Sequence, residues 1–377
     1  MEEGELHFKD KNQEEEEKKN QIEEDGKNVI VTKANLENLK KINGDSEQIY
    51  IEELKFTKVF EKLNNIKFKQ LEILSLSKCD VSSIDFLIND NFKSLIILEI
   101  KDNEGNKIKS IDKLSQAPFI ELKVLDLSGN DISSIKEMTN VPFKDLEILI
   151  LSNNNITDIK PIIEGPFTNL TKLDLSNNGI VSIDILGDKN KLKNLKKLYL
   201  NNNKISNISV LKNDIFNSLE ELQLTNNEIV NINDLKNAPF KELKELYLFG
   251  NQIQSINALT NPNFKKLEIL MLSQNKIDDI DCLDKCPFKE LQILNLFNNR
   301  IKKIDVFKND LFKKITELDL SFNSIKNVDI FLVGNFHKFH LNIEGNPLDY
   351  SNNNIEKIYG YFGIEYEYDS LFEFNYK

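Results

Sequence analysis

Histidine and cysteine, the side chains that most often bind metals or carry out acid–base and nucleophilic chemistry, are scarce in this sequence. The 377 residues contain His7, His337, His340, Cys79, Cys282 and Cys286. His337 and His340 are close enough to suggest a metal site, but neither a cysteine nor paired carboxylates accompany them. Cys282 and Cys286 have no histidine nearby, which favours a structural role for both over a metal or redox site. A glycine-rich phosphate loop is also missing, so we predict a protein without catalytic activity, metal or cofactor.

Aromatic side chains offer a different chemistry, because they occur where the leucine spacing does not require them. Tyr199 and Tyr247 each lie between two leucines, so in a strand they point to the face opposite those leucines. The same spacing places further large apolar side chains on this face: Phe249, Ile269, Met271, Ile293, Phe297 and Phe322. Clustered exposed aromatics mark protein interfaces, and we predict that these residues bind a partner protein. The alternative is that aromatic residues simply suit strands.

The corresponding positions earlier in the chain are mostly polar or acidic. They are occupied by Ser75, Glu99, Asp126, Ile150 and Asp174. We therefore predict that Glu99, Asp126 and Asp174 make the N-terminal half of the same face acidic.

All these residues belong to a sequence unit that recurs about a dozen times. Starting at Leu146, the unit reads L-x-x-L-x-L-x-x-N-x-I-x-x-I, followed by a spacer and a phenylalanine. Its asparagines are mostly 24 residues apart: Asn130, Asn154, Asn178, Asn203, Asn227, Asn251, Asn275, Asn299, Asn323 and Asn346. A fixed period in the twenties indicates a stacked repeat solenoid. Cys79 takes the asparagine position in the unit that starts at Leu71.

Each position of the unit has an expected structural role. The spaced leucines form the inward face of a short strand, and each asparagine is expected to turn inward and bond backbone groups as a ladder. In most units Asp, Asn or Ser follows the second isoleucine, as at Asp85 and Asp184, and these residues are expected to cap short helices. A phenylalanine such as Phe143 then fills the space between the helix and strand layers.

The unit resembles the leucine-rich repeat, and its second half resembles the short isoleucine-rich repeats of the phosphatase-1 regulatory leucine-rich-repeat subunit. Similar repeats occur in an axonemal dynein light chain and in bacterial internalins. The resemblance covers roughly residues 49–348 and implies an α/β solenoid, a horseshoe with a concave parallel β-sheet and short helices or 3-10 turns on its convex side. It further implies a non-catalytic scaffold that binds proteins on the concave face, with regulation of a phosphatase or of the cytoskeleton as one role.

The distribution of charge and composition sets the expected boundaries. We expect a disordered acidic tail at residues 1–28, an N-terminal cap at 29–62, an array of about 12 units at 63–348 and an aromatic C-terminal cap at 349–377. The net charge of −12 disfavours nucleic-acid binding. Neither a secretory leader nor a membrane-spanning run is visible, and cysteine-rich caps are missing. These features predict a monomer in the cytoplasm, in the nucleus or on the cytoskeleton. The alternative is a secreted or cell-surface recognition protein of leucine-rich-repeat type.

Overall fold

The computed structural model describes residues 27–102, 107–188, 191–309, 312–333, 339–349 and 354–363. These residues divide into two compact units, the first ending at Leu170 and the second beginning at Thr171. The predicted acidic tail up to residue 26, together with His7, His337 and the aromatic residues beyond Gly363, lies outside the described residues.

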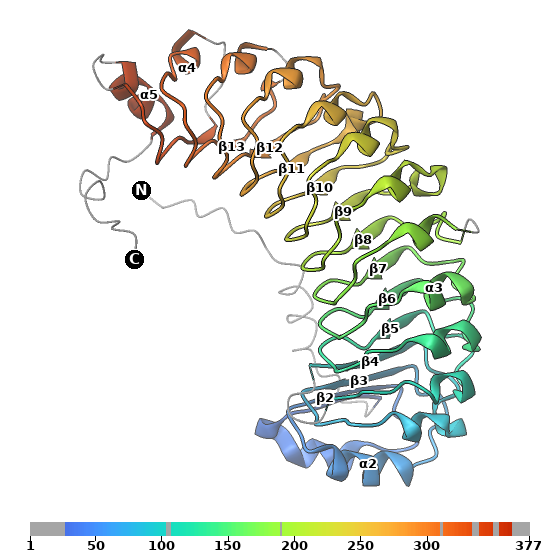
Figure 1. Cartoon of the computed structure of the whole chain (residues 1–377). Helices are drawn as coiled ribbons and strands as arrows, with labels where there is room; N and C mark the ends of the chain where they lie inside the picture. Colours follow the sequence, from blue (N-terminus) through green and yellow to red (C-terminus); the bar gives the residue numbers. More distant parts are fainter. Residues whose placement is uncertain are drawn as a thin grey trace, which may run out of the picture. The chain divides into compact units, whose positions relative to one another are not determined.

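The first unit contains six strands that pair in parallel and in chain order (Figure 1). They are β1 (Asn28–Val31), β2 (Gln48–Glu52), β3 (Ile73–Ser77), β4 (Ile97–Lys101), β5 (Val124–Asp126) and β6 (Ile148–Ile150). The connections between them contain η1 (Lys33–Lys41), α2 (Phe56–Asn64), η2 (Asp85–Ile88), η3 (Asp90–Phe92), η4 (Leu114–Gln116), η5 (Lys136–Asn140) and α3 (Lys160–Glu164).

The second unit contains eight strands with the same parallel pairing of sequence neighbours. They are β7 (Lys172–Asp174), β8 (Lys197–Tyr199), β9 (Glu221–Gln223), β10 (Glu245–Tyr247), β11 (Ile269–Met271), β12 (Ile293–Asn295), β13 (Glu317–Asp319) and β14 (His340–Asn342). The helical segments are η6 (Asp184–Gly187), η7 (Ser209–Lys212), η8 (Asp214–Phe216), η9 (Asn233–Asn237), η10 (Asn257–Thr260), η11 (Phe264–Lys266), η12 (Asp281–Lys285), η13 (Asp305–Lys308), α4 (Ile330–Val333) and α5 (Asn354–Phe362).

In both units the strands form one layer and the short helices form the layer behind it (Figure 1). Most of the helices are single 3-10 turns, because the spacer leaves room for only three to five residues before the chain must return to the next strand. Parallel strands joined by such connections make an α/β solenoid, which confirms the predicted fold class.

The core between the two layers is built from the apolar positions of the repeat. Leu149 and Leu151 of one turn, and the isoleucines that follow its asparagine, are fully or almost fully buried. Phenylalanines stack behind them: the ring centroids of Phe119 and Phe143 are 5.8 Å apart, and those of Phe143 and Phe167 are 6.4 Å apart. Full burial of one such side chain stabilises the fold by about 2 kcal/mol, so each repeat adds to the core of its own unit.

From β5 onward, the asparagine that follows the strand bonds backbone groups of its own turn, and at positions such as Asn227 it also bonds those of the preceding turn. Nδ2 of Asn227 donates to the carbonyls of Leu224 at 3.1 Å and Thr225 at 3.2 Å, and to Leu200 of the preceding turn at 2.9 Å. Its Oδ1 accepts the N–H of Ile205 at 3.0 Å. Donation to the carbonyls two and three residues earlier recurs at Asn130, Asn154, Asn178, Asn203, Asn251, Asn275, Asn299, Asn323 and Asn346.

Cys79 makes the donor contacts of an asparagine at its position in the array. Its buried thiol has a single proton to donate, and its Sγ lies 3.1 Å from the carbonyl oxygen of Ser77 and 3.3 Å from that of Ile51 in the preceding turn. The cysteine is therefore a substitute for the ladder amide within the first unit.

The polar residues that follow the second isoleucine do not cap the helices, and this prediction was wrong. Helix η2 starts at Asp85, yet its cap residue is Ile84, which has no side-chain cap bond. Instead, Ser83 Oγ accepts the N–H of Asp85 at 3.1 Å. The same bond is made by Ser110, Asp158, Ser182, Asn207, Asn231, Ser255, Asp279 and Asn327. The side chain that fixes the start of the helix thus lies two residues earlier, between the isoleucines.

Different segments cap the first and the last turns of the chain. At the N-terminal end, Thr32 Oγ1 accepts the N–H of Ala34 at 3.2 Å and caps η1. At the C-terminal end, α5 buries Ile355, Ile358 and Phe362. The Phe362 ring lies 4.9 Å from that of Phe339, so α5 covers the apolar side chains of the last turn.

Candidate protein-interaction surface

The outward side chains of β7–β14 form two columns on the second unit, because consecutive strands pair without a register shift. The first column is Lys172, Lys197, Glu221, Glu245, Ile269, Ile293, Glu317 and His340. The second column is Asp174, Tyr199, Gln223, Tyr247, Met271, Asn295, Asp319 and Asn342. We call the surface formed by these columns and by the residues two and three positions after the second column the strand face.

Apolar side chains from β10 to β13 and their following turns are neighbours on this strand face. Tyr247 is in register with Met271, and Ile269 is in register with Ile293. We call the following set the aromatic patch: Tyr247, Phe249, Ile269, Met271, Ile293, Phe297 and Phe322. Six of the seven side chains are half-buried, and Phe322 is exposed.

Tyr199 does not belong to this patch, although the sequence predicted it as a partner-binding residue. Gln223 separates Tyr199 from Tyr247 in the column. The Tyr199 hydroxyl donates to Glu221 at 2.8 Å, Lys197 binds the same carboxylate at 2.9 Å, and the ammonium of Lys172 lies 5.0 Å from the Tyr199 ring centroid. Tyr199 is therefore held in a charged cluster at the N-terminal side of the patch.

The hydrogen bonds within this charged cluster shift the pKa values of Tyr199 and Glu221. Partial burial, and then the bond to Glu221, raise the pKa of Tyr199 above its usual range. Burial acts to raise the pKa of Glu221, but the bonds from Lys197, Tyr199 and Gln223 outweigh it and lower this pKa. These shifts favour a protonated tyrosine and an ionised glutamate, the pair of forms that the Tyr199–Glu221 hydrogen bond requires.

Tyr247 has one polar contact at the edge of the patch. Its hydroxyl donates to Glu245 Oε2 at 2.7 Å, while the rest of the side chain is half-buried. Burial, together with this bond, raises the pKa of Tyr247. The bond fixes the hydroxyl and leaves the ring as part of the apolar surface.

Phe322 has an unusual backbone conformation for a bulky residue. Its φ is 53°, in the left-handed region that glycine and asparagine favour. The equivalent position in the other repeats of the second unit is Asn177, Asn202, Asn226, Gly250, Gln274, Asn298 or Gly345. A Cβ on Gly345 would lie 2.9 Å from the Phe322 ring, so this glycine makes room for it.

The Phe322 ring is presented to solvent. It is 50% exposed and contacts Phe297 edge to face, with ring centroids 5.5 Å apart. An exposed aromatic in a left-handed conformation has about 1 kcal/mol or more of backbone strain without the compensation of full burial. Such strain is concentrated at functional sites, which singles out this end of the patch.

The predicted acidic residues of the first unit are engaged in local bonds. Lys101 lies 3.3 Å from Glu99 and 3.8 Å from Asp126. Ser75 donates to Glu99 at 2.6 Å, and Asp126, only 6% exposed, accepts from the Ser128 hydroxyl at 2.6 Å. Burial raises the pKa of Asp126. In the second unit, Asp174 accepts the N–H of Ser176 at 3.0 Å.

An aliphatic row on the first unit was missed by the sequence prediction. Ile73, Ile97, Val124 and Ile148 are in register along β3–β6 and are half-buried on the outward side. The signal was present, because they hold the same position in their repeats as Ile269 and Ile293. The first unit therefore has its own apolar row, next to the ion pairs that Lys101 makes with Glu99 and Asp126.

The cysteine thiols differ in accessibility and in pKa. Burial raises the pKa of Cys79 to about 11. Hydrogen bonding from Cys286 lowers the pKa of the half-buried Cys282, and the same bond and burial raise that of Cys286. The three cysteines, all of which lie among the described residues, form no disulfide.

Iodoacetamide at pH 8 should therefore modify Cys282 at least tenfold faster than Cys79. Only the thiolate reacts, and with its raised pKa Cys79 is ionised in roughly one molecule in a thousand at that pH. Mass spectrometry of peptides from a time course measures both rates. Equal rates for the two cysteines would show that the repeat around Cys79 opens readily.

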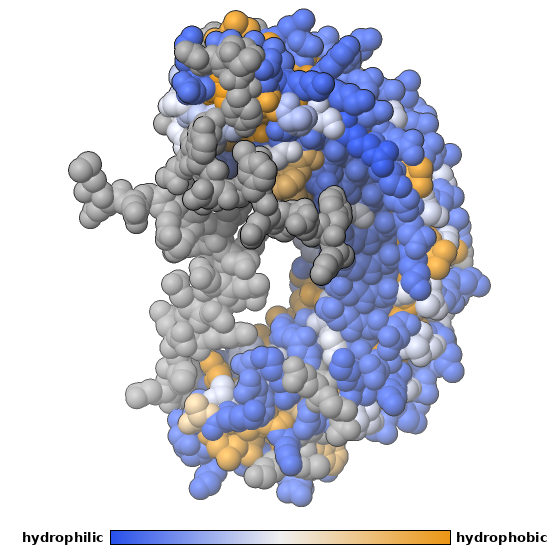
Figure 2. All heavy atoms as spheres, turned by 60° about the vertical axis from the view of Figure 1, so that its left-hand side comes forward, coloured by the Kyte–Doolittle hydropathy of each residue, from blue (hydrophilic) through white to orange (hydrophobic). Residues whose placement is uncertain are grey.

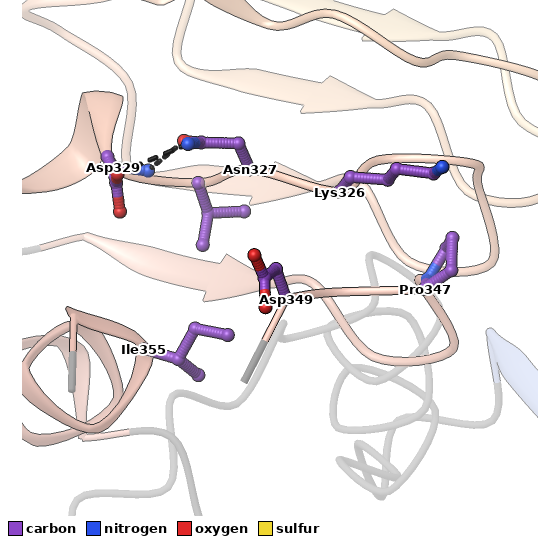
Figure 3. Close-up of a pocket in the computed structure, with 7 residues that line it drawn as sticks. Lys326, Asn327, Asp329, Pro347, Asp349 and Ile355 are labelled. Atoms are coloured by element: carbon purple, nitrogen blue, oxygen red, sulfur yellow. Dashed lines mark hydrogen bonds between the residues drawn. The ribbon is translucent and has the colours of Figure 1, made fainter. Parts of the chain in front are cut away.

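Other site types find little support in the described part of the chain. Groups of three or more His, Cys, Asp or Glu side chains suited to a metal are not found there, and neither is a helix that is long and apolar enough to cross a bilayer. A pocket of about 410 Å³ lies beside the last repeats (Figure 3). It is lined by Lys326, Asn327, Val328, Asp329, Pro347, Asp349 and Ile355. These residues follow the ladder asparagines and are not part of the strand face.

Exposed apolar side chains are uncommon on the surface seen in Figure 2. In the view of Figure 2 most of the surface is hydrophilic, and apolar side chains gather in only a few separate places. Where exposed apolar side chains lie next to one another, as in the aromatic patch, they often mark a binding site.

Comparison with known proteins agrees with this architecture. The family described as Leucine Rich repeats (2 copies) matches residues 120–164, 144–187, 168–213 and 241–285. A comparison with curated protein sequences gives no significant match.

Solved structures with the same fold include an internalin from Listeria monocytogenes, with 22% identity, a TM-score of 0.62 and coverage of 84% of this chain and 89% of that one. A leucine-rich-repeat protein from Leptospira interrogans has 23% identity, a TM-score of 0.62 and coverage of 87% and 84%. The plant peptide hormone receptor RGFR1, solved in complex with RGF2, has 19% identity, a TM-score of 0.55 and coverage of 81% and 52%. Residues 120–213 and 241–285 thus match the leucine-rich-repeat family, and these solved structures share the solenoid fold of this chain.

Proposed function

We propose that this protein is a non-catalytic interaction module that binds a partner protein through the aromatic patch of the second unit. The observation that carries the proposal is the Phe297–Phe322 pair, in which a bulky ring in a left-handed conformation is half-exposed instead of buried. Tyr247, Ile269 and Met271 extend this pair into an apolar surface. Aromatic and methionine side chains of this kind form the buried centres of protein interfaces.

The binding surface lies on rigid strands, which supports recognition of a partner with little rearrangement. Each strand of the patch is held by ladder bonds and by a buried core, so little conformational entropy is lost on binding. Regulation of a phosphatase or of a cytoskeletal protein inside the cell is the particular role that we propose from the repeat type. The identity of the bound partner decides that role.

A photo-crosslinking amino acid at a single position tests the proposal. Met271 lies within the patch, and Val181, which is 60% exposed and follows a core isoleucine outside the strand columns, is the matched control. In lysate from the native source, we expect a defined protein to be crosslinked at position 271 and not at position 181. Crosslinking of the same protein only at position 181 would place the interface outside the strand face and contradict the proposal.

A further inference from the structure

The charges around the aromatic patch are almost all of one sign. In the strand columns of β9–β14, the acidic side chains are Glu221, Glu245, Glu317 and Asp319, and the column of Phe297 continues to Glu344. Among the described residues at these outward positions there is no lysine or arginine, and the only other titratable groups are His340 and Tyr247. The patch is thus an apolar centre with an acidic rim on both sides.

The acidic side chains on the two sides of the patch differ in whether other side chains bind their carboxylates. Glu221 is bound by Lys197, and Glu245 accepts the Tyr247 hydroxyl. By contrast, Glu317 and Glu344 take part in none of the ion pairs of the described residues. The uncompensated charge therefore lies at the C-terminal side.

This charge is close to the strained aromatic pair. Asp319 is in register with Asn295, two residues before Phe297, and uses Oδ1 for the N–H and the hydroxyl of Ser321. The N–H of Phe322 donates to the carbonyl of Glu344 at 2.7 Å. A cation placed over the exposed Phe322 ring would therefore be near carboxylates as well as near an aromatic face.

We propose that the partner docks with a segment that combines apolar side chains with arginine or lysine. This inference rests on the proposed function of the patch. The apolar side chains of the segment pack on Ile269, Met271 and Ile293, and its basic side chains reach Phe322 and the carboxylates of Glu317, Asp319 and Glu344. Arginine suits this position best, since its planar guanidinium stacks on aromatic rings and bonds carboxylates in a bidentate manner.

Charge also decides against two other occupants of the patch. Residues 1–28 of this chain carry 11 acidic and five basic side chains, and the whole chain has a net charge of −12. Both its own N-terminal segment and a second copy would bring negative charge to a negative rim, which is unfavourable. A separate basic and apolar segment is the complementary partner.

Selection of random 12-residue peptides displayed on phage, with the full chain as bait, tests this inference. Counter-selection against the Tyr247→Ala, Phe297→Ala double variant keeps only peptides that depend on the patch. We expect the retained peptides to combine leucine, isoleucine or phenylalanine with arginine or lysine. A synthetic copy of one peptide should bind Glu317→Gln, Glu344→Gln about fivefold more weakly and should lose affinity as salt rises.

The control for charge removal is Glu356→Gln with Asp278→Asn, two exposed residues outside the strand face, and it should leave the affinity of the peptide unchanged. Patch-dependent peptides that are neutral or acidic, or that bind the Glu317→Gln, Glu344→Gln variant normally, would overturn the inference and leave the proposed function standing. If peptides bind the chain but none survives the counter-selection, the proposed function of the patch fails as well.

Discussion

Replacement of Asn227 by leucine is expected to lower the free energy of unfolding by roughly 2–4 kcal/mol. The two side chains have similar size, so the change removes hydrogen bonds without opening a large cavity. The buried N–H of Ile205 loses its acceptor, and the carbonyls of Leu200, Leu224 and Thr225 lose a donor. Because two turns of the array share these groups, the loss should loosen the stacking of neighbouring repeats.

The matched control for this prediction is the preceding residue. Asn226 is exposed and has a φ of 52°, so glycine, which accepts a left-handed conformation, is the suitable replacement. Asn226→Gly should change the melting temperature far less than Asn227→Leu, as measured by circular dichroism. Equal melting temperatures for the two variants would show that the ladder bonds contribute nothing to stability.

The double variant Tyr247→Ala, Phe297→Ala is expected to abolish binding of the protein partner. It removes two large contact surfaces near the centre of the patch, and Phe322 loses the ring against which it packs. Truncation of two aromatic anchors commonly weakens an interface by about 4 kcal/mol or more, which is roughly a thousandfold in affinity.

The same double variant should remain folded. Both side chains are partly exposed, and the buried leucines of their strands, Leu246, Leu248, Leu294 and Leu296, are unchanged. We expect the melting temperature to fall by only a few degrees. Unfolding of the variant would show that these side chains belong to the core. A folded variant that still binds would move the interface to another surface, such as the aliphatic row of Ile97 and Val124.

The fold could be predicted from the sequence because each 24-residue repeat determines a strand, the face that the strand buries and the turn that follows it. Leucine alternation gives the strand and its inward face, and the position of Asn227 relative to Leu224 gives the turn at which an amide meets unpaired carbonyls. Even the exception at Cys79 follows, since a thiol at that position can donate to the same backbone groups.

Details set by backbone geometry or by contacts between repeats were harder to predict. Asp85 has the residue type of a helix cap, but only the observed turn shows that Ser83 reaches its N–H. The spacing placed Glu99 and Asp126 outward, yet Lys101 joins them because β4 extends to this residue. Likewise, the left-handed φ of Phe322 gives no signal in a pattern that records only residue type.

The most direct test of the central claim is a calorimetric titration of the partner identified by crosslinking at position 271. Three forms of the full chain are compared: the wild type, Tyr247→Ala with Phe297→Ala, and Ile97→Ala with Val124→Ala. If the aromatic patch is the interaction surface, affinity falls about a thousandfold for the second form and stays within about twofold of the wild type for the third. Normal affinity for the second form, together with loss of binding for the third, would contradict the account.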